Sequence, residues 1–448
     1  MRSPARLVEV IISLLRAVRT VVRADSDPAR QVLFATLMQA RWPVRVAHDL
    51  HGLVTGTWAS ALLVGCYGLA ALLSIAPARN RTARVLAVAR HANARRQVAR
   101  VASWIGAEDC GLVRTGLKTL VRLAGIGGLT LLFAPRAMSR SLRLVRACDR
   151  RYGFLESCRA VEVVAWYARS TAMLTARRPG AVLVSGDSNP EEVGFIAAAR
   201  ARGIPQVFVA HAYPTPFSPP LDFTLSILEG QQAVDARRLK GPITGSVLLA
   251  GMEGESAQLD PHRVERLNPV IGIFPPKALS WKTLAAIVDD CRAHFHAREI
   301  VIRWHPSMLE SPHLAHHIAD RSGIRQYPGS APFHQIARRC DWVIAAENSN
   351  VHLPLLKLGI PTVVVRGLGL YPRSRSDLYG FIAHGVVFRP VDSIREVRAD
   401  EFAAFFSDRW ITRFKEYDAS YLLPSGAIEH EVRRAIQQLL TTGSVETT

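Results

Sequence analysis

The stretch from Asp341 to Val365 constrains the fold most, because its pattern changes twice within 25 residues. Residues 342–345 form an apolar run that is typical of a buried strand, and the polar residues 347–350 interrupt it. Residues 351–358 have helical apolar spacing and end at a glycine, after which the β-branched run 361–365 predicts a second strand. Strand, turn, helix and strand in this order predict a βαβ unit of a parallel sheet.

The polar turn of this unit, Glu347-Asn348-Ser349-Asn350, precedes the amino end of the predicted helix. Free backbone N–H groups and the helix dipole favour a phosphate at such a position. We expect Ser349 or Asn350 to cap the helix, and the same residues can contact an anion. A cap without any ligand is the alternative for these residues.

A second polar strand end lies upstream, where the apolar run 299–302 is followed by Arg303, Trp304, His305 and Pro306. Proline does not continue inside a sheet, so His305 is placed at the carboxyl end of a strand. Ligand-contacting groups of α/β sheets lie at such ends. We therefore predict that His305 is a site residue, with a structural histidine as the alternative.

The two motifs together resemble the donor half of GT-B glycosyltransferases: Arg-x-His-Pro at 303–306, then Asn-Ser-Asn and LLKLGIPTVVV about forty residues later. The similarity, over roughly residues 181–391, is to bacterial sialyl-, polysialyl- and Kdo-transferases of capsule and lipopolysaccharide assembly. CDP-glycerol glycerophosphotransferases share the pattern. The resemblance implies that His305 and Ser349 contact the phosphate of a cytidine-activated donor. The residues expected beside them are Arg303, Pro306, Asn348 and Asn350.

Strands and helices also alternate from residue 160 onward, which predicts a parallel sheet. Asp187 follows the predicted strand 180–184, and His211 follows the strand 206–210. Sugar transfer must remove a proton from the acceptor hydroxyl, so we take His211 or Asp187 as the candidate general base, with a structural aspartate as the alternative for Asp187. The resembled family commonly has glycine after this histidine; Ala212 replaces it here and puts a tight backbone approach in doubt.

Two further basic residues are candidates for donor binding. Lys277 follows the predicted strand 270–274 and is expected to neutralise a donor phosphate, unless it is an ordinary surface lysine. Arg366 begins a basic, glycine-punctuated loop suited to a pyrophosphate or a carboxylate. The chain has no G-x-G-x-x-G motif and no P-loop, and residues 83–440 carry no D-x-D loop, so we expect neither a cofactor nor a required metal.

Composition indicates an anionic partner. The net charge of +19 and the pI of 10.4 suit anionic lipid or a phosphorylated substrate. The basic run 136–151 lacks interleaved aromatic residues and any nucleic-acid motif, so nucleic acid is not expected. The six cysteines are scattered without a C-x-x-C pair, and we expect reduced packing residues in a cytosolic protein.

The amino-terminal part indicates a membrane surface. Residues 7–22 fit either a basic amphipathic helix on anionic lipid or a core-facing helix. Residues 50–77 carry no charge and are long enough to span a bilayer, but both flanks are strongly positive. We favour a re-entrant, monotopic or buried helical hairpin, with a single span as the alternative. A second apolar patch, 123–135, suits an interface.

We therefore expect an α/β protein of the GT-B class, in which two Rossmann-like parallel-sheet domains face across a cleft. The predicted divisions are a helical, membrane-associating segment 1–82, an acceptor domain 83–265 and a nucleotide-sugar donor domain 266–440. The expected activity is metal-independent transfer of a sugar, including sialic acid or Kdo from a CMP donor, to a bacterial surface polysaccharide or lipopolysaccharide. The expected location is the cytoplasmic face of the plasma membrane. The alternatives are a polyol phosphate transferase, a sugar-nucleotide epimerase and a non-catalytic membrane-surface scaffold.

Overall fold

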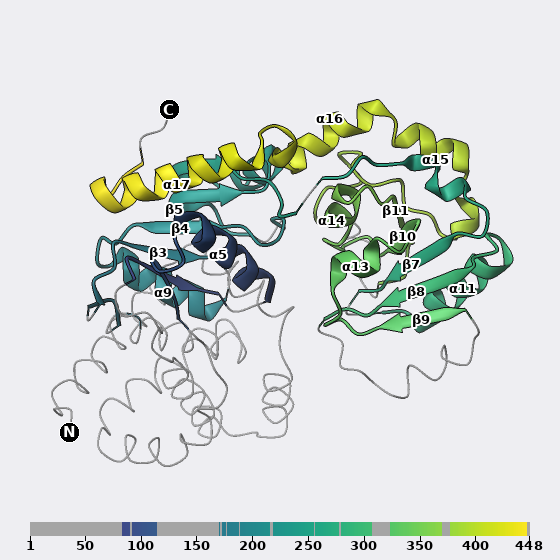
Figure 1. Cartoon of the computed structure of the whole chain (residues 1–448), viewed down its shortest axis with the longest axis horizontal. Helices are drawn as coiled ribbons and strands as arrows, with labels where there is room; N and C mark the ends of the chain where they lie inside the picture. The colour runs from purple at the N-terminus through teal and green to yellow at the C-terminus, as the bar shows by residue number, and fades with distance from the viewer. Residues whose placement is uncertain are drawn as a thin grey trace, which may run out of the picture. The chain divides into compact units, whose positions relative to one another are not determined.

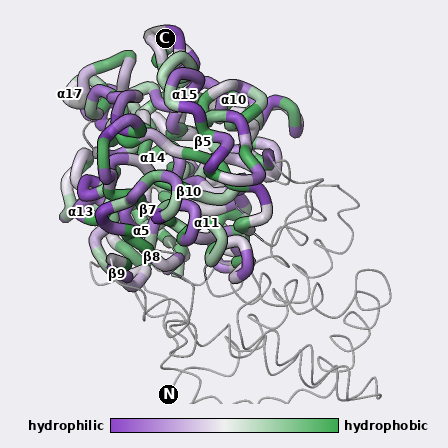
Figure 2. Tube along the Cα trace, turned by 90° about the vertical axis from the view of Figure 1, so that its right-hand side faces the viewer, coloured by the Kyte–Doolittle hydropathy of each residue, from purple (hydrophilic) through white to green (hydrophobic). Residues whose placement is uncertain are grey.

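The structure is a computed structural model, and it describes residues 83–89, 92–113, 170, 173–175, 177–187, 189–215, 218–254, 256–276, 279–306, 323–369 and 377–445. The expected membrane segments within 1–82 and 123–135, and Lys277, lie outside these residues. Within the described part of the chain, no helix combines the length and the apolar character needed to cross a membrane. Figure 2 shows short apolar stretches alternating with polar ones along that part.

The described chain forms two compact units. Unit 1 holds the described residues of 83–228, 233–250 and 425–445, and unit 2 holds those of 229–232 and 251–424. Residues 229–232 and 251–265 belong with unit 2, and the last described helix belongs with unit 1.

Unit 1 is built on a six-stranded parallel sheet with the strand order β2-β1-β3-β4-β5-β6 (Figure 1). Its strands are β1 (Val85–Val88), β2 (Cys110–Val113), β3 (Ala181–Val184), β4 (Gln206–Val209), β5 (Asp222–Leu228) and β6 (Thr244–Leu249). Every residue of β1, β3 and β4 is buried, which explains why all of them except Gln206 are apolar and show no alternation.

Helices cover both faces of this sheet. They are α5 (Ala92–Ile105), α9 (Pro190–Arg200), α10 (Gln231–Arg238) and α17 (Ser425–Thr442). The helices α5 and α17 lie together on one face, where Val98 and Ile428 join a core cluster with Val85 and Leu183. Successive side chains of a strand point to opposite faces, so Val184 points away from this cluster, toward the face on which α9 packs.

Unit 2 is built on a five-stranded parallel sheet with the order β11-β10-β7-β8-β9. Its strands are β7 (Val270–Phe274), β8 (Glu299–Arg303), β9 (Ile324–Tyr327), β10 (Trp342–Ala345) and β11 (Thr362–Val364). The strand order reverses between β7 and β10, as it reverses between β1 and β3 in unit 1. Ligands of doubly wound sheets bind outside the carboxyl ends of the strands at such a reversal.

Helical elements connect the strands of unit 2 and follow the last of them. The α-helices are α11 (Trp281–Ala293), α13 (Phe333–Ala337), α14 (His352–Lys357), α15 (Ala399–Phe405) and α16 (Asp408–Tyr417), and the 3-10 helices are η2 (Pro261–Glu265), η4 (Ile394–Glu396) and η5 (Ala419–Tyr421). Close packing of a helix end on β7 needs Gly272, because a Cβ there would lie 2.8 Å from the Sγ of Cys340.

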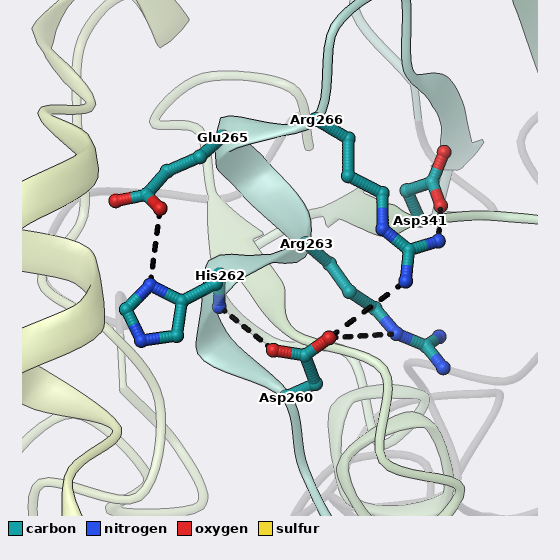
Figure 3. A network of polar contacts seen from close by, with 6 residues as sticks. All are labelled: Asp260, His262, Arg263, Glu265, Arg266 and Asp341. Carbon is teal, nitrogen blue, oxygen red and sulfur yellow. Dashed lines mark hydrogen bonds and ion pairs between the residues drawn. The ribbon is translucent and has the colours of Figure 1, made fainter.

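The segment that leads into unit 2's sheet is fixed by a polar network (Figure 3). The Asp341 carboxylate accepts a hydrogen bond from the Val270 N–H at 2.8 Å and pairs with Arg266 at 2.7 Å. Asp260 pairs with Arg266 at 3.7 Å and accepts from the His262 N–H at 3.1 Å. These bonds join η2 to the starts of β7 and β10, at the opposite edge from the strand ends that carry the predicted site.

Two parallel-sheet units of Rossmann type confirm the predicted α/β class. The cysteines among the described residues, Cys110, Cys291 and Cys340, are free. Burial raises the thiol pKa of Cys110 to about 11 and that of Cys340 to about 12, as expected of packing residues.

Candidate functional site

The carboxyl edge of unit 2's sheet carries most of the predicted donor-binding residues. His305 follows β8, residues 346–350 follow β10, and Arg366 lies just beyond β11. The strand β7 lies between β8 and β10, so His305 and Ser349 flank its end at two strand spacings, about 10 Å. The reversal of strand order falls at this place, which agrees with a ligand site.

The backbone at His305 is held firmly. The N–H of Trp304 donates to the Tyr327 carbonyl at 3.0 Å and extends the pairing of β8 with β9. The Trp304 indole N–H donates to the Gln326 side chain at 3.1 Å. A Cβ on Gly329 would lie 2.5 Å from the Cα of Pro306, so only glycine permits this close approach. His305 therefore leaves the sheet at a fixed position.

Arg303 stabilises the loop that packs against this edge of the sheet. Its guanidinium donates to the carbonyls of Gly329, at 2.8 Å, and Ala331, at 3.2 Å, and lies 5.5 Å from the ring centre of Phe333. The sequence predicted a donor contact for Arg303. In the structure these bonds hold the loop after β9, which in turn contacts Pro306.

Two side chains of the turn after β10 accept hydrogen bonds from the backbone. Asn348 accepts a hydrogen bond from the Leu378 N–H at 2.9 Å, and Ser349 Oγ accepts from the Val351 N–H at 3.4 Å. The predicted cap at Ser349 or Asn350 is wrong: α14 begins at His352, and its N-cap is Val351, which has helical dihedrals and no side-chain cap bond. Residues before α14 form a turn, and Ser349 closes that turn instead.

Glu347 and Arg366 lie near each other at this edge. Burial raises the pKa of the Glu347 carboxyl above its usual value, and the Gly367 N–H and the Arg366 charge act against this shift. Arg366 also pairs with Asp392 at 3.3 Å, and its side chain is about half exposed (48%). Arg366 thus keeps a solvent-facing guanidinium at the edge, as a donor-binding arginine requires.

His352 is a supporting residue that sequence reasoning missed. Its imidazole is fully buried, with Nε2 donating to the Ala346 carbonyl at 3.0 Å and Nδ1 accepting from the Thr362 hydroxyl at 3.0 Å. Burial lowers the pKa of His352 to about 4. The neutral ring therefore fastens the start of the polar turn to β11.

In unit 1, the two candidate bases lie close together at the carboxyl ends of β3 and β4. Nδ1 of His211 contacts the Ser185 carbonyl, which can only accept, so Nδ1 carries the hydrogen and Nε2 carries the lone pair. Burial lowers the pKa of His211 below its usual value, so the ring is neutral at pH 7. A neutral imidazole with a fixed tautomer is suited to accept a proton.

Asp187 is bound in an ion pair that the sequence did not predict. Its carboxylate lies 2.5 Å from Nη1 of Arg237, on α10, and both side chains are largely buried. The carboxylate is thus compensated, which makes His211 the better base of the two. Arg237 stands beside Arg238 in a polar helix, and nothing in that pattern distinguishes a buried guanidinium from an exposed one.

The turn after β3 has its own steric requirement. Glu192 is fully buried and accepts from the Asn189 amide at 2.5 Å, and a Cβ on Gly186 would lie 2.4 Å from its carboxylate. Ala212, by contrast, is exposed and is not among the described residues with positive φ. Alanine is therefore accommodated at this position without backbone strain.

Comparisons with known proteins concern the fold. No protein-family model and no curated protein matches the sequence. The structure is similar to that of the calicheamicin glycosyltransferase CalG4, with 10% identity and a TM-score of 0.48 over 80% of this chain and 99% of that one. It is also similar to the UDP-GlcNAc 2-epimerase from Neisseria meningitidis bound to UDP-GlcNAc, with 11% identity and a TM-score of 0.42 over 80% of this chain and 100% of that one. The similarity to Acinetobacter baumannii MurG has 12% identity and a TM-score of 0.40 over 80% of this chain and 97% of that one. At these identities and TM-scores the similarity concerns the backbone fold alone and assigns no substrate.

Proposed function

We propose that this chain is a glycosyltransferase of the GT-B type that moves a sugar from a nucleotide-activated donor to an acceptor hydroxyl. The observation that carries the proposal is the placement of His305 and Ser349 on either side of β7, at the edge where the strand order reverses. Imidazole and hydroxyl groups there suit the phosphate oxygens of a nucleotide. Arg366, beside Glu347, adds a positive charge to the same edge.

In the proposed reaction, Nε2 of His211 takes the proton of the acceptor hydroxyl while its oxygen forms a bond to the anomeric carbon. The bond from that carbon to the donor phosphate breaks, and the phosphate oxygen keeps the electron pair. Hydrogen bonds from His305 and Ser349 stabilise the negative charge that develops on this oxygen. Asn348, which accepts from the Leu378 N–H, holds the turn that presents Ser349, and Asn350 lies beside them.

The finer proposal is a CMP-linked donor, such as an activated sialic acid or Kdo, and a bacterial surface polysaccharide or lipopolysaccharide as acceptor. It is supported by the resemblance of residues 303–306 and 348–350 to enzymes of that group. The chemistry proposed here needs no metal ion, because side chains of the protein supply the stabilising groups.

We also propose peripheral attachment to an anionic membrane. Residues 1–82 and 114–169 hold 21 Lys and Arg but only 7 Asp and Glu, so they carry a surplus of 14 of the chain's 19 positive charges. A cluster of basic residues is attracted to anionic lipid, at about 1 kcal/mol for each residue near the surface. Sedimentation with phosphatidylserine vesicles, lost in neutral vesicles and at high salt, would support this attachment.

The test of the main proposal is thermal stabilisation by CMP, CDP, UDP, GDP and ADP. A ligand at a hundredfold excess over its Kd stabilises the folded protein by about 2.7 kcal/mol. We expect one nucleotide to act, and its effect to disappear in His305→Ala but not in the control His294→Ala, an exposed residue just past the carboxyl end of α11. Stabilisation by none of them would favour a non-catalytic scaffold. Turnover of nucleotide sugar without an acceptor would favour an epimerase.

A further inference from the structure

We infer that Arg237 is a positioning residue for His211: by compensating the Asp187 carboxylate, it keeps the imidazole uncharged and its Nε2 available to accept a proton. The role of His211 as the base rests on the function proposed above. The electrostatic relationship among the three residues does not, and it can be measured separately.

Arg237 is held in one place by contacts from three directions. Its Nη1 lies 2.5 Å from Asp187 Oδ2, in the turn after β3, and donates to the Pro219 carbonyl at 2.7 Å. Its guanidinium lies 5.4 Å from the ring centre of Phe208, in β4. Only 5% of its side chain is exposed. The Arg237 side chain, which comes from a polar helix, therefore lies buried at the carboxyl edge of the sheet.

This arrangement is costly if it serves stability alone. Two charges removed from water lose much of their hydration, and their attraction restores it only with good geometry and further hydrogen bonds. Here Nε of Arg237 is buried and has no hydrogen-bond partner among the described residues. An apolar pair of similar volume would stabilise the fold as well, so the pair calls for another role.

The role follows from the charges that face His211. Those charges are Asp187, from the turn after β3, and Arg237, from α10, while the Ser185 carbonyl accepts from Nδ1. Asp187 alone favours the protonated imidazole, because a nearby negative charge stabilises the cation and raises the histidine pKa. Burial is the largest influence on the pKa of His211 and lowers it, whereas the hydrogen bond to Ser185 and the charge of Asp187 raise it. Arg237 acts in the same direction as burial and offsets part of the Asp187 effect.

The experiment is a titration of His211 by NMR in the full-length protein labelled at histidine ¹³Cε1, with the His211 signal assigned from its loss in His211→Gln. In Arg237→Met the Asp187 charge is left to act on the imidazole, and we expect the pKa of His211 to rise by about one unit or more. Arg237→Lys keeps the charge and is expected to stay near the wild type. The matched control is Arg238→Met, which removes the same charge one residue away, at a side chain that is 65% exposed.

Asp187→Asn gives the opposite test, because it leaves Arg237 uncompensated and is expected to lower the pKa of His211 further. An unchanged pKa in folded Arg237→Met would overturn the inference. If Arg237→Met does not fold, an unchanged or raised pKa in Asp187→Asn would overturn it. If the pKa values move as expected but no variant and no wild-type protein transfers a sugar, the inference stands and the proposed function fails.

Discussion

The ammonium group of Lys357 lies 3.1 Å from the carboxylate of Asp418, and the two side chains are 2% and 0% exposed. Lys357, the last residue of α14, also donates to the Met252 carbonyl at 2.6 Å and to the Ser420 hydroxyl at 2.8 Å. Asp418 accepts hydrogen bonds from the N–H groups of Met252 and Ser420. Within unit 2, this pair thus joins the helix after the polar turn to two segments distant in sequence.

Removing one partner of this pair should be strongly destabilising. Lys357→Met leaves a buried, uncompensated carboxylate, and we expect the free energy of unfolding to fall by about 3 to 5 kcal/mol. Denaturant titration measures the change, with Lys282→Met, an exposed lysine on α11, as the control. The double variant Lys357→Met/Asp418→Asn should lose less than the sum of the two single variants. Additive losses would show that the charges do not interact.

The stability of the protein should depend on pH through His352. Its pKa is about 4 in the folded protein and about 6.5 when unfolded, so the unfolded state binds the additional proton between these values. Stability is therefore complete above pH 6.5 and decreases as the pH falls toward 4, by up to about 3 kcal/mol from this group.

The measurement compares unfolding of the wild type and His352→Gln across pH 4.5 to 7.5. Glutamine can still donate to the Ala346 carbonyl but does not titrate. The difference between the two proteins isolates this histidine from all other groups. A difference that stays constant with pH would contradict the prediction.

The close approach of Gly329 to Pro306 predicts an effect on ligand binding. In Gly329→Ala the new methyl would lie 2.5 Å from the Pro306 Cα, so the backbone at His305 must shift. We expect the apparent Kd for the nucleotide, measured by thermal stabilisation, to rise at least about tenfold, because a phosphate contact depends on fixed geometry. Gly426→Ala, where a Cβ meets nothing within 4 Å, is the control and should leave nucleotide binding unchanged.

Loss of the proposed base should separate chemistry from donor binding. His211→Gln is expected to lower kcat by about 100- to 10,000-fold, the usual contribution of general base catalysis. His211 lies in unit 1 and the proposed phosphate contacts lie in unit 2, so thermal stabilisation by the nucleotide should persist. A parallel loss of nucleotide stabilisation would show that His211 supports structure rather than proton transfer.

Strands with continuous apolar runs could be predicted from sequence. The runs before Asp187, His211 and His305 became β3, β4 and β8, and their polar ends lie at the carboxyl edges as expected. The strand β9 was not predicted, because Ile-Arg-Gln-Tyr at an edge position is half exposed and has no apolar pattern. The order of strands in each sheet depends on which crossover connections form, and a single sequence shows no signal for it.

The supporting residues of the candidate site were beyond sequence reasoning for a different reason. Arg237, Lys357 and His352 are polar residues in short helices, where an exposed side chain is the ordinary outcome. Each is buried because its partner lies far away in the chain or at the end of another strand: Asp187, Asp418 and Thr362. Sequence patterns within a segment predict where a strand ends. The side-chain contacts that stabilise this strand end form between distant segments, and the local pattern does not show them.

The position of α17 has a consequence for biosynthesis. Its side chains Ile428, Val432 and Leu439 complete the core of unit 1, yet the ribosome makes them after the whole of residues 251–424. One face of the sheet containing β1, β3 and β4 must therefore wait for its last helix while unit 2 emerges. Exposed apolar surface of this kind is prone to aggregation during synthesis. A nascent chain stopped before residue 425 should therefore depend on chaperones, and the full chain should no longer need them.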